Sequence, residues 1–244
     1  MTDKPLAFIS GASGGIGGAI SARLAEDGFD LVLHYNKNED SITDLARSLE
    51  EKYETKIYIV QADFSKPEET VGKITNLSLF PDVIVHNSGS SKCSLITDYS
   101  QEDIKTELAA GIMTPFMLTQ AFLPFLIRKK QGKIIILSSI WGLTGGSCEV
   151  LYSTVKGGLN SFVKALAKEV APSNIQVNGV APGAIKTPML NHLSEPEQQQ
   201  LAEEIPAGRL GSPMEVASVV SFLASKESNY VNGQIISVNG AWYC

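Results

Sequence analysis

The feature that most constrains the fold of this chain is an alternation of short apolar runs with longer segments of helical length. Val, Ile and Leu fill most of the short runs almost continuously, as strands that are buried on both faces require. These runs lie at residues 6–9, 31–34, 57–62, 83–86, 134–137, 175–181 and 234–238. The longer segments between them include residues 16–27, 102–130, 151–170 and 214–225.

A strand–helix–strand repeat of this kind joins parallel strands by right-handed crossovers, and helices then cover both faces of the sheet. The 244 residues contain no linker, low-complexity tract or internal repeat. We therefore predict a single α/β domain over residues 1–244, a Rossmann-type, doubly wound parallel sheet of seven strands flanked by helices. Such sheets bind ligands beyond the carboxyl ends of their strands. The residues that follow each strand are therefore the candidates for function.

Composition narrows the class of partner. The net charge of −6 argues against nucleic acid and anionic membranes as partners. No apolar run approaches the roughly 20 residues needed to span a bilayer, and residues 1–7 have no apolar run long enough for a secretory signal. Three cysteines, Cys93, Cys148 and Cys244, are widely spaced without a metal-ligand pattern. We expect a cytoplasmic protein with free thiols, no metal, and no nucleic-acid or membrane partner.

A glycine-rich turn, Ser10-Gly11-Ala12-Ser13-Gly14-Gly15-Ile16-Gly17, follows the first predicted strand and opens a predicted helix. Its glycines allow a tight turn, and the helix N-terminus offers unpaired N–H groups to a pyrophosphate. The spacing is Gly-x-x-x-Gly-x-Gly rather than the commoner Gly-x-Gly-x-x-Gly. Turns of this kind also form for backbone reasons alone, but the position directly after an apolar strand favours nucleotide binding.

Two other strand ends support a nucleotide site. Asp63 follows the third strand, where its carboxylate would accept a hydrogen bond from an adenine amino group; the alternative is a turn or helix cap before Pro67. The fourth strand ends in a small polar turn that contains Asn87. At the end of the second strand no acid occurs before Glu39, whereas an acid there would bind the ribose hydroxyls of NAD. NADP(H) is therefore favoured, with His34, Asn36 and Lys37 as candidate contacts of its 2′-phosphate, and NAD(H) remains the alternative.

The residues after the fifth strand predict the chemistry. Ser139 ends this strand region, and Tyr152 and Lys156 share one face of the helix predicted at 151–170, because they are four residues apart. Reduction of a ketone needs a hydride on carbon and a proton on oxygen. A phenol with a pKa near 10 is a poor partner at neutral pH unless its anion is stabilised. A lysine ammonium one turn away would stabilise the anion and lower the phenol pKa, and Ser139 would bind the substrate oxygen. The alternative, if each is considered alone, is that Tyr152 and Lys156 form a surface contact and that Ser139 only forms a turn.

Together these motifs resemble the short-chain dehydrogenase/reductase family over essentially the whole chain. The glycine-rich turn, the Asn87 turn, Ser139, Tyr152-x-x-x-Lys156 and Ala181-Pro182-Gly183 follow the order and spacing of that family. The resemblance implies that Lys156 also holds the nicotinamide ribose and that Ile185 and Thr187 contact the carboxamide. The residues predicted to contact the cofactor are Gly11, Ser13, Gly15, Ile16, Gly17, His34, Asn36, Lys37, Asp63, Asn87, Tyr152, Lys156, Pro182, Gly183, Ile185 and Thr187.

The segment from Asn232 to Gly240 is similar to that of 3-oxoacyl-[acyl-carrier-protein] reductases, which implies a homotetramer or homodimer that packs the long fourth and fifth helices and the last strand. Two departures stand out. Gly111 occupies the position where the family usually has an asparagine that holds a proton-relay water. Gly14 stands where many NADP-dependent members carry arginine. Arg128-Lys129-Lys130 would supply one base for docking an acidic carrier, but the second expected base is Ser173.

A smaller subgroup, the bacterial elongation factor P 5-aminopentanone reductases, is similar in other stretches. These are Leu33-His34-Tyr35-Asn36, Leu95-Ile96-Thr97-Asp98, the region from Ser138 to Tyr152, and the ending from Asn239 to Cys244. Members reduce a ketone on a modified lysine of that translation factor. This resemblance implies that Glu149 meets the cationic amine of the substrate, although a solvated carboxylate before a helix is the alternative. The predicted substrate contacts are Ser139, Trp141, Glu149 and Tyr152.

The sequence therefore predicts an NADPH-dependent carbonyl reductase that acts on 3-oxoacyl thioesters, with the elongation factor P ketone as the alternative substrate. A non-catalytic nucleotide-binding regulator is the third reading, and only Gly111 favours it. Residues 186–206 follow the sixth strand, where family members shape the substrate pocket. This segment is polar, has helix potential at 196–204, and is predicted to be a substrate lid.

Overall fold

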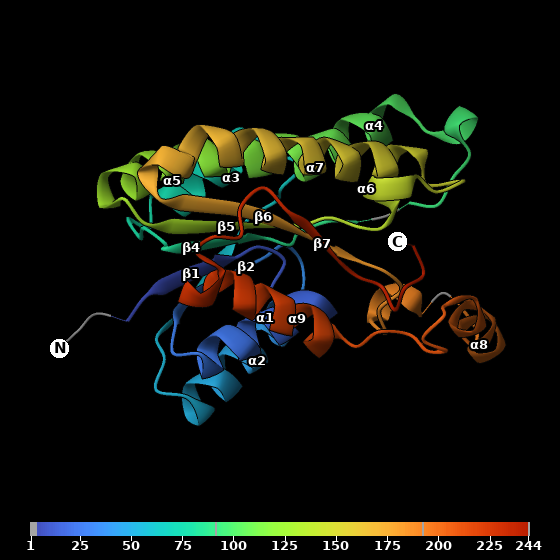
Figure 1. The fold of residues 1–244 in the computed structure, drawn as a ribbon, viewed down its shortest axis with the longest axis horizontal. Coiled ribbons are helices and arrows are strands. Elements are labelled where there is room, and N and C mark those ends of the chain that lie inside the picture. The colour runs from blue at the N-terminus through green and yellow to red at the C-terminus, as the bar shows by residue number, and fades with distance from the viewer. Residues whose placement is uncertain (1–3, 91, 192, 244) are drawn as a thin grey trace.

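The computed structural model describes residues 4–90, 92–191 and 193–243. These residues form one sheet of seven parallel strands in the order β3-β2-β1-β4-β5-β6-β7, with helices on both faces (Figure 1). The predicted doubly wound α/β fold is confirmed. The strands are β1 (Leu6–Ile9), β2 (Asp30–Tyr35), β3 (Ile57–Gln61), β4 (Val83–His86), β5 (Gly132–Leu137), β6 (Ile175–Pro182) and β7 (Ile235–Val238).

The strands lie within two residues of the predicted runs because burial on both faces leaves a readable signal. Every residue of β4, β5 and β6 is buried. The chain runs outward from β1 to β3 and returns to place β4 beside β1. That reversal opens a crevice beyond the carboxyl ends of β1 and β4, where doubly wound sheets bind nucleotides.

Two helical layers enclose the sheet (Figure 1). One layer contains α1 (Gly15–Glu26), α2 (Glu39–Lys52) and α9 (Pro213–Ala224). The opposite layer contains α3 (Pro67–Thr75), α4 (Gln101–Leu108), α5 (Thr114–Lys129) and α7 (Val150–Val170). Each layer packs on its own core cluster of buried apolar residues. The short α6 (Trp141–Thr144) and α8 (Glu195–Glu204) lie near the end of the sheet where the C-terminus also lies.

The helix predicted at 102–130 is divided by a π-helical turn, Ala109–Met113, between α4 and α5. The Thr114 N–H bonds to the Ala109 carbonyl five residues earlier, which widens the helix locally. The stretch Gln101–Lys129 is long and apolar enough to cross a membrane by length and composition. This corrects the expectation that no stretch reaches that length. Part of this apolar surface packs in the core, where Leu118, Phe122 and Leu126 are buried.

Two of the three cysteines meet in space although they are 55 positions apart. Cys93 and Cys148 are free thiols, as predicted, and the Cys93 thiol is hydrogen-bonded to Cys148. The Ser94 N–H also donates to the Cys148 carbonyl at 2.8 Å, which joins the loop after β4 to the loop before α7. The prediction for Cys244 lies outside the described residues.

Candidate active site

Tyr152 and Lys156 share one face of α7, near the carboxyl end of β5. The Lys156 side chain is buried, and its Nζ donates a hydrogen bond of 2.7 Å to the carbonyl of Leu137, the last residue of β5. The same nitrogen lies 5.5 Å from the centroid of the Tyr152 ring. An ammonium has three donors. The bond to Leu137 therefore fixes Lys156 beside Tyr152 and leaves two donors for other partners.

Ser139 follows β5 and completes the predicted trio. Its side chain is buried, its Oγ accepts a 3.2 Å hydrogen bond from the Trp141 N–H, and it is hydrogen-bonded to Tyr152. The structure therefore brings Ser139, Tyr152 and Lys156 together. A carbonyl oxygen that reached Ser139 and Tyr152 would meet two hydroxyl groups, the arrangement needed to hold it and to protonate it.

Burial dominates the electrostatics of this trio. It raises the pKa of Tyr152 to about 12, opposed by the hydrogen bond from Ser139 and reinforced by the carboxylates of Glu149 and Glu107. The expectation of a lowered Tyr152 pKa is therefore corrected: desolvation is the largest effect, and it raises the pKa. Burial lowers the pKa of Lys156 to about 8, although Glu107 acts in the opposite direction. At neutral pH Tyr152 is protonated and Lys156 is mostly charged, the states required of a proton donor and its stabilising cation.

The glycine-rich turn lies against the end of β4. Gly11 has a φ of +65°, and a Cβ there would lie 3.1 Å from the Asn87 Nδ2 and from the Ser88 Oγ. A Cβ on Gly17 would overlap the Gly11 carbonyl oxygen. The Asn87 amide donates to the carbonyls of Ser10 at 2.9 Å and Gly11 at 3.1 Å. Asn87 therefore holds the turn in shape, a role that the sequence did not reveal.

His34 departs from its predicted role as a contact for the 2′-phosphate. The ring is 1% exposed and stacks on Phe64, with the centroids 4.1 Å apart. Its Nδ1 accepts a 3.1 Å hydrogen bond from the Gly11 N–H, so the protonated Nε2 donates to the Ala62 carbonyl at 3.0 Å. Neither ring nitrogen is free to bind a phosphate. Burial lowers the pKa of His34 to about 4, which keeps the ring neutral while it supports the glycine-rich turn.

The other residues near the predicted adenosine end are closer to solvent. Asp63 is half-buried, and its Oδ1 accepts from the Ser65 N–H at 3.0 Å and from the Ser65 hydroxyl at 2.8 Å. This is the turn role considered from sequence, and the adenine contact stays a prediction. Asn36 and Lys37 are exposed directly after β2. Lys37 is close enough to Asp63 to help hold the pKa of that carboxyl below its usual range.

The crevice fits a dinucleotide on two observations. Within the described residues, the Ser88 Oγ is buried and has no hydrogen-bond partner, and it lies beside Gly11. Thr187 lies so close to the turn that a Cβ on Gly15 would be 2.9 Å from its Cγ2. The segment after β6 thus closes over the turn after β1. Pro182, Gly183 and Ile185 belong to the same segment, and Ser13 and Ile16 to the turn, so these predicted contacts meet at one edge of the sheet.

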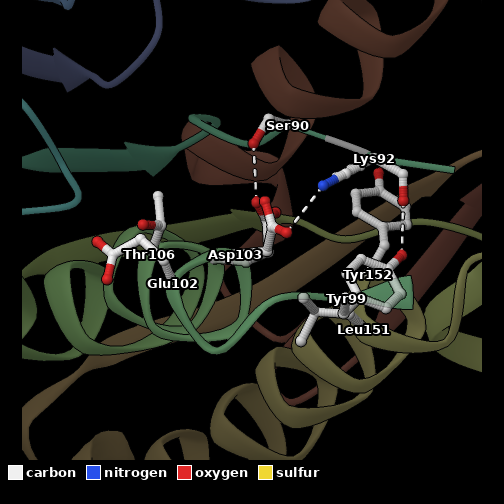
Figure 2. A pocket seen from close by; sticks show the side chains of 9 residues that line it. Ser90, Lys92, Tyr99, Glu102, Asp103, Thr106, Leu151 and Tyr152 are labelled. Carbon is white, nitrogen blue, oxygen red and sulfur yellow. Dashed lines mark hydrogen bonds and ion pairs between the residues drawn. The ribbon is translucent and has the colours of Figure 1, made fainter. Parts of the chain in front are cut away.

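A cavity of about 250 Å³ opens beside Tyr152 (Figure 2). Residues of α4, α7 and the loop after β4 line it: Ser90, Lys92, Tyr99, Glu102, Asp103, Thr106, Glu107, Leu151 and Tyr152. Lys92 forms an ion pair with Asp103 at 2.8 Å, and the Tyr99 hydroxyl donates to the Lys92 carbonyl at 2.6 Å. The sequence did not reveal this wall; the only signal was the spacing of Asp103 and Glu107 on one helix face.

The remaining predicted residues lie around the trio. Trp141 contacts two aromatic residues of the C-terminal segment, with centroid distances of 5.7 Å to Trp242 and 5.5 Å to Tyr243. Glu149 is close enough to Tyr152 to raise the pKa of its phenol. The structure thus places both near the candidate site, while their contact with a substrate stays a prediction.

Gly111 lies inside the π-helical turn, and its neighbour Val155 fills the space of the missing side chain. A Cβ at this position would lie 2.5 Å from the Val155 Cγ1. An asparagine would therefore not fit unless Val155 moved. Gly111 therefore has no side chain that could hold the relay water expected from the resemblance.

Comparisons with known proteins identify the class of this nucleotide-binding fold. A family profile described as enoyl-(acyl carrier protein) reductase matches residues 11–242. The chain is 48% identical over 239 residues to the uncharacterized oxidoreductase YmfI of Bacillus subtilis, across 98% of each chain. It is 38% identical over 242 residues to the 3-oxoacyl-[acyl-carrier-protein] reductase FabG of Aquifex aeolicus, across 98% of this chain and 97% of FabG.

Solved structures agree. The 3-oxoacyl-[acyl-carrier protein] reductase from Brucella melitensis matches with a TM-score of 0.93 at 27% identity, over 99% of this chain and 92% of that one. YwfH, an NADPH-dependent reductase involved in bacilysin biosynthesis, matches with a TM-score of 0.90 at 26% identity over 99% of each chain. The chain belongs to the short-chain dehydrogenase/reductase family. It is an oxidoreductase with a nicotinamide cofactor, so the reading as a non-catalytic regulator is set aside.

Proposed function

We propose that this protein is an NADPH-dependent reductase of 3-oxoacyl thioesters. The observation that carries the proposal is the trio of Ser139, Tyr152 and Lys156 beside an open cavity at the carboxyl edge of the sheet. Similarity to FabG over nearly the full chain supports this substrate class. We also propose that the protein works in the cytoplasm, where such thioesters are elongated.

The chain supplies binding, orientation and the proton. The glycine-rich turn and the N-terminus of α1 would hold the pyrophosphate, and Lys156 the nicotinamide ribose. A bound nicotinamide supplies the hydride that reduces the carbonyl carbon. Ser139 orients the carbonyl oxygen, and Tyr152 transfers its phenolic proton to that oxygen as the negative charge develops. The Lys156 ammonium stabilises the phenolate that remains.

The function is tested by NADPH consumption with a short 3-oxoacyl thioester. Tyr152→Phe is the blank, because it keeps the ring and removes the proton donor. Turnover by the wild-type protein and its loss in Tyr152→Phe would support the proposal. If the wild-type protein binds NADPH but does not consume it with this substrate, the assignment as a general thioester reductase is contradicted.

The preference for NADP(H) rests on the exposed end of β2. Lys37 and Asn36 are exposed there and no acid precedes Glu39, so a 2′-phosphate would meet a cation rather than a carboxylate. We expect Lys37→Glu to raise the Kd of NADPH while the Kd of NADH changes little. Lys56→Glu, an equal charge change on an exposed residue just before β3, is the control. Equal loss for both cofactors would refute a phosphate contact at Lys37.

A second candidate substrate is the ketone that a modified lysine of elongation factor P carries, with its cationic amine. The negative charge of the site favours this substrate: Glu102, Asp103 and Glu107 line the cavity, and the Glu149 carboxylate acts on Tyr152. Lys92 is the single cation among the residues that line this cavity. A negative cavity attracts an ammonium group and repels an acidic carrier.

The two substrates are separated by comparing kcat/KM for a short amino ketone with that for the neutral ketone of the same length. Preference for the cationic ketone, reduced by Glu149→Lys, would support the elongation factor P reading. Unchanged kinetics in Glu149→Lys would remove Glu149 from substrate recognition.

We propose a homotetramer or homodimer that packs α4, α5 and β7 against a second copy. The outer face of α5 carries the exposed Phe116 and Ile127, with Met113 just before the helix, and β7 is an edge strand. Phe116 also packs on Phe162 of α7, with the centroids 5.5 Å apart. We expect Phe116→Glu to shift the mass measured by light scattering toward the monomer; an unchanged mass would contradict this interface.

Residues 186–206 are proposed to act as the substrate lid. They contain a 3-10 turn at Pro188–Leu190 and α8, and α8 confirms the helix expected at 196–204. Thr187, at the start of the segment, touches Gly15 of the cofactor turn. We expect bound NADPH to slow tryptic cleavage after Lys186. Cleavage at the same rate with and without NADPH would contradict a lid coupled to the cofactor.

A further inference from the structure

Reduction consumes one proton per turnover, and the usual route for that proton is altered in this chain. The side chain that would hold a relay water is absent at Gly111, and Val155 fills its place. Tyr152 is largely enclosed by α7, Ser139 and the α4 wall of the cavity. After each proton transfer, Tyr152 must regain a proton from solvent through other groups.

Glu107 lies where such a route would run. It is half-buried on the last turn of α4 and lines the cavity that Tyr152 also lines. The Ser90 hydroxyl donates a 2.9 Å hydrogen bond to its Oε2, one of the dashed lines in Figure 2. This bond aims the carboxylate and leaves further lone pairs for water. A cavity of about 250 Å³ has room for several waters, each of which takes up about 30 Å³.

The carboxylate is also coupled to Lys156. A Cβ on Gly89, the residue before Ser90, would lie 3.3 Å from the Lys156 Nζ. The loop whose Ser90 binds Glu107 therefore passes directly beside the Lys156 ammonium. Glu107 raises the pKa of Lys156, and Lys156 lowers that of Glu107. Burial is the larger effect on Glu107 and raises its pKa above the ordinary value. A carboxyl group with a raised pKa exchanges protons closer to neutral pH.

We propose that Glu107 carries protons from solvent to the Lys156–Tyr152 pair and replaces the relay that Gly111 lacks. This inference rests on the proposed reductase function. Glu107 does not touch the reacting atoms; it is a positioning residue that acts through Lys156.

The protons balance over one turnover. The O–H bond of Tyr152 breaks as the O–H bond of the product alcohol forms, while the carbonyl carbon is reduced by the hydride and the nicotinamide is oxidised. The phenolate takes a proton from the Lys156 ammonium. Lys156 regains one from the Glu107 carboxyl through cavity water, and the Glu107 carboxylate takes one from bulk solvent.

The charged groups around Glu107 set its pH dependence. Lys156 and Glu149 act on it from α7 and from the residue before that helix. Ser90 contacts it from the loop after β4, and the ion pair of Lys92 with Asp103 lies on the same cavity wall. Among the groups named in its pKa, only Lys156 favours the ionised carboxylate by charge.

The test is Glu107→Gln, which keeps an acceptor for Ser90 and removes the titrating proton. We expect kcat for reduction to fall about tenfold above pH 8, where protons are scarce, and about twofold at pH 6, with KM unchanged. The solvent deuterium isotope effect on kcat should rise. Formate should restore turnover in Glu107→Ala, and Glu107→Asp should retain the wild-type pH profile in part. Glu50→Gln on α2, across the sheet, is the control of equal charge.

A second readout needs no turnover. In the protein without cofactor, Glu107→Gln should lower the pKa of Tyr152, followed by phenolate absorbance with Tyr152→Phe subtracted, because the carboxylate no longer repels the phenolate. A wild-type pH profile in Glu107→Gln, or no rescue of Glu107→Ala by formate, would overturn the relay. If the wild-type protein reduced no carbonyl, the proposed function would fail, and an unshifted Tyr152 titration would then overturn the coupling of Glu107 separately.

Discussion

Replacing His34 with glutamine should flatten the dependence of stability on pH. The folded ring has a pKa of about 4 and the unfolded ring one of 6.5, so the unfolded chain binds more protons between these values. The stability contributed by the neutral His34 ring is therefore fully present above pH 6.5 and is lost as the pH falls toward 4. At pH 5, about 1.5 units below the unfolded pKa, the titration of His34 lowers the free energy of unfolding by about 2 kcal/mol.

His86 makes the expected change larger and serves as a comparison. Its ring is buried, and burial lowers its pKa to about 3, so it contributes a further loss of about 2 kcal/mol at pH 5. Its Nε2 lies 2.9 Å from the Thr119 hydroxyl, which donates to Pro115, so this nitrogen is the donor. Unlike His34, His86 makes no hydrogen bond to the glycine-rich turn among the described contacts.

The assay is urea unfolding at pH 7 and pH 5 at constant ionic strength. We expect the wild-type protein to lose about 4 kcal/mol between these values, and His34→Gln and His86→Gln to lose about 2 kcal/mol each. Glutamine offers an acceptor and a donor without titrating. NADPH affinity of the folded wild-type protein should fall only as the pH approaches 4, where His34 becomes protonated and no longer accepts from Gly11. A wild-type pH dependence of stability in His34→Gln would refute the argument.

Two further predictions concern the packing around the site. Gly111→Asn should destabilise the fold by about 1–3 kcal/mol, because its Cβ meets Val155, and adding Val155→Ala should recover part of that loss in thermal unfolding; additive losses would contradict the contact. Asn87→Ala should cost about 1–3 kcal/mol and weaken NADPH binding at least tenfold, because it removes the amide donor to the Ser10 carbonyl and one of the two donors to the Gly11 carbonyl; unaltered NADPH affinity by calorimetry would contradict its role in the turn.

The trio was predictable because its signals are local or periodic. Tyr152 and Lys156 are one helical turn apart, so any helix through them places both on one face. Ser139 follows an apolar strand whose end lies at the ligand-binding edge of a parallel sheet. The sequence predicted the wrong direction for the Tyr152 pKa shift, because desolvation depends on every element that packs around the phenol.

Residue types along the chain set the architecture and the edge of the sheet at which chemistry occurs. Buried parallel strands require near-continuous apolar runs, and a tight turn over a phosphate requires glycine, so both leave residue types that can be read along the chain. Tertiary structure alone decided which distant side chains meet. His34 became a support for the glycine-rich turn only because Gly11 and Ala62 flank its ring. Glu107 became a candidate relay only because α4 lies against α7, since burial and electrostatic coupling arise from contacts that no local pattern records.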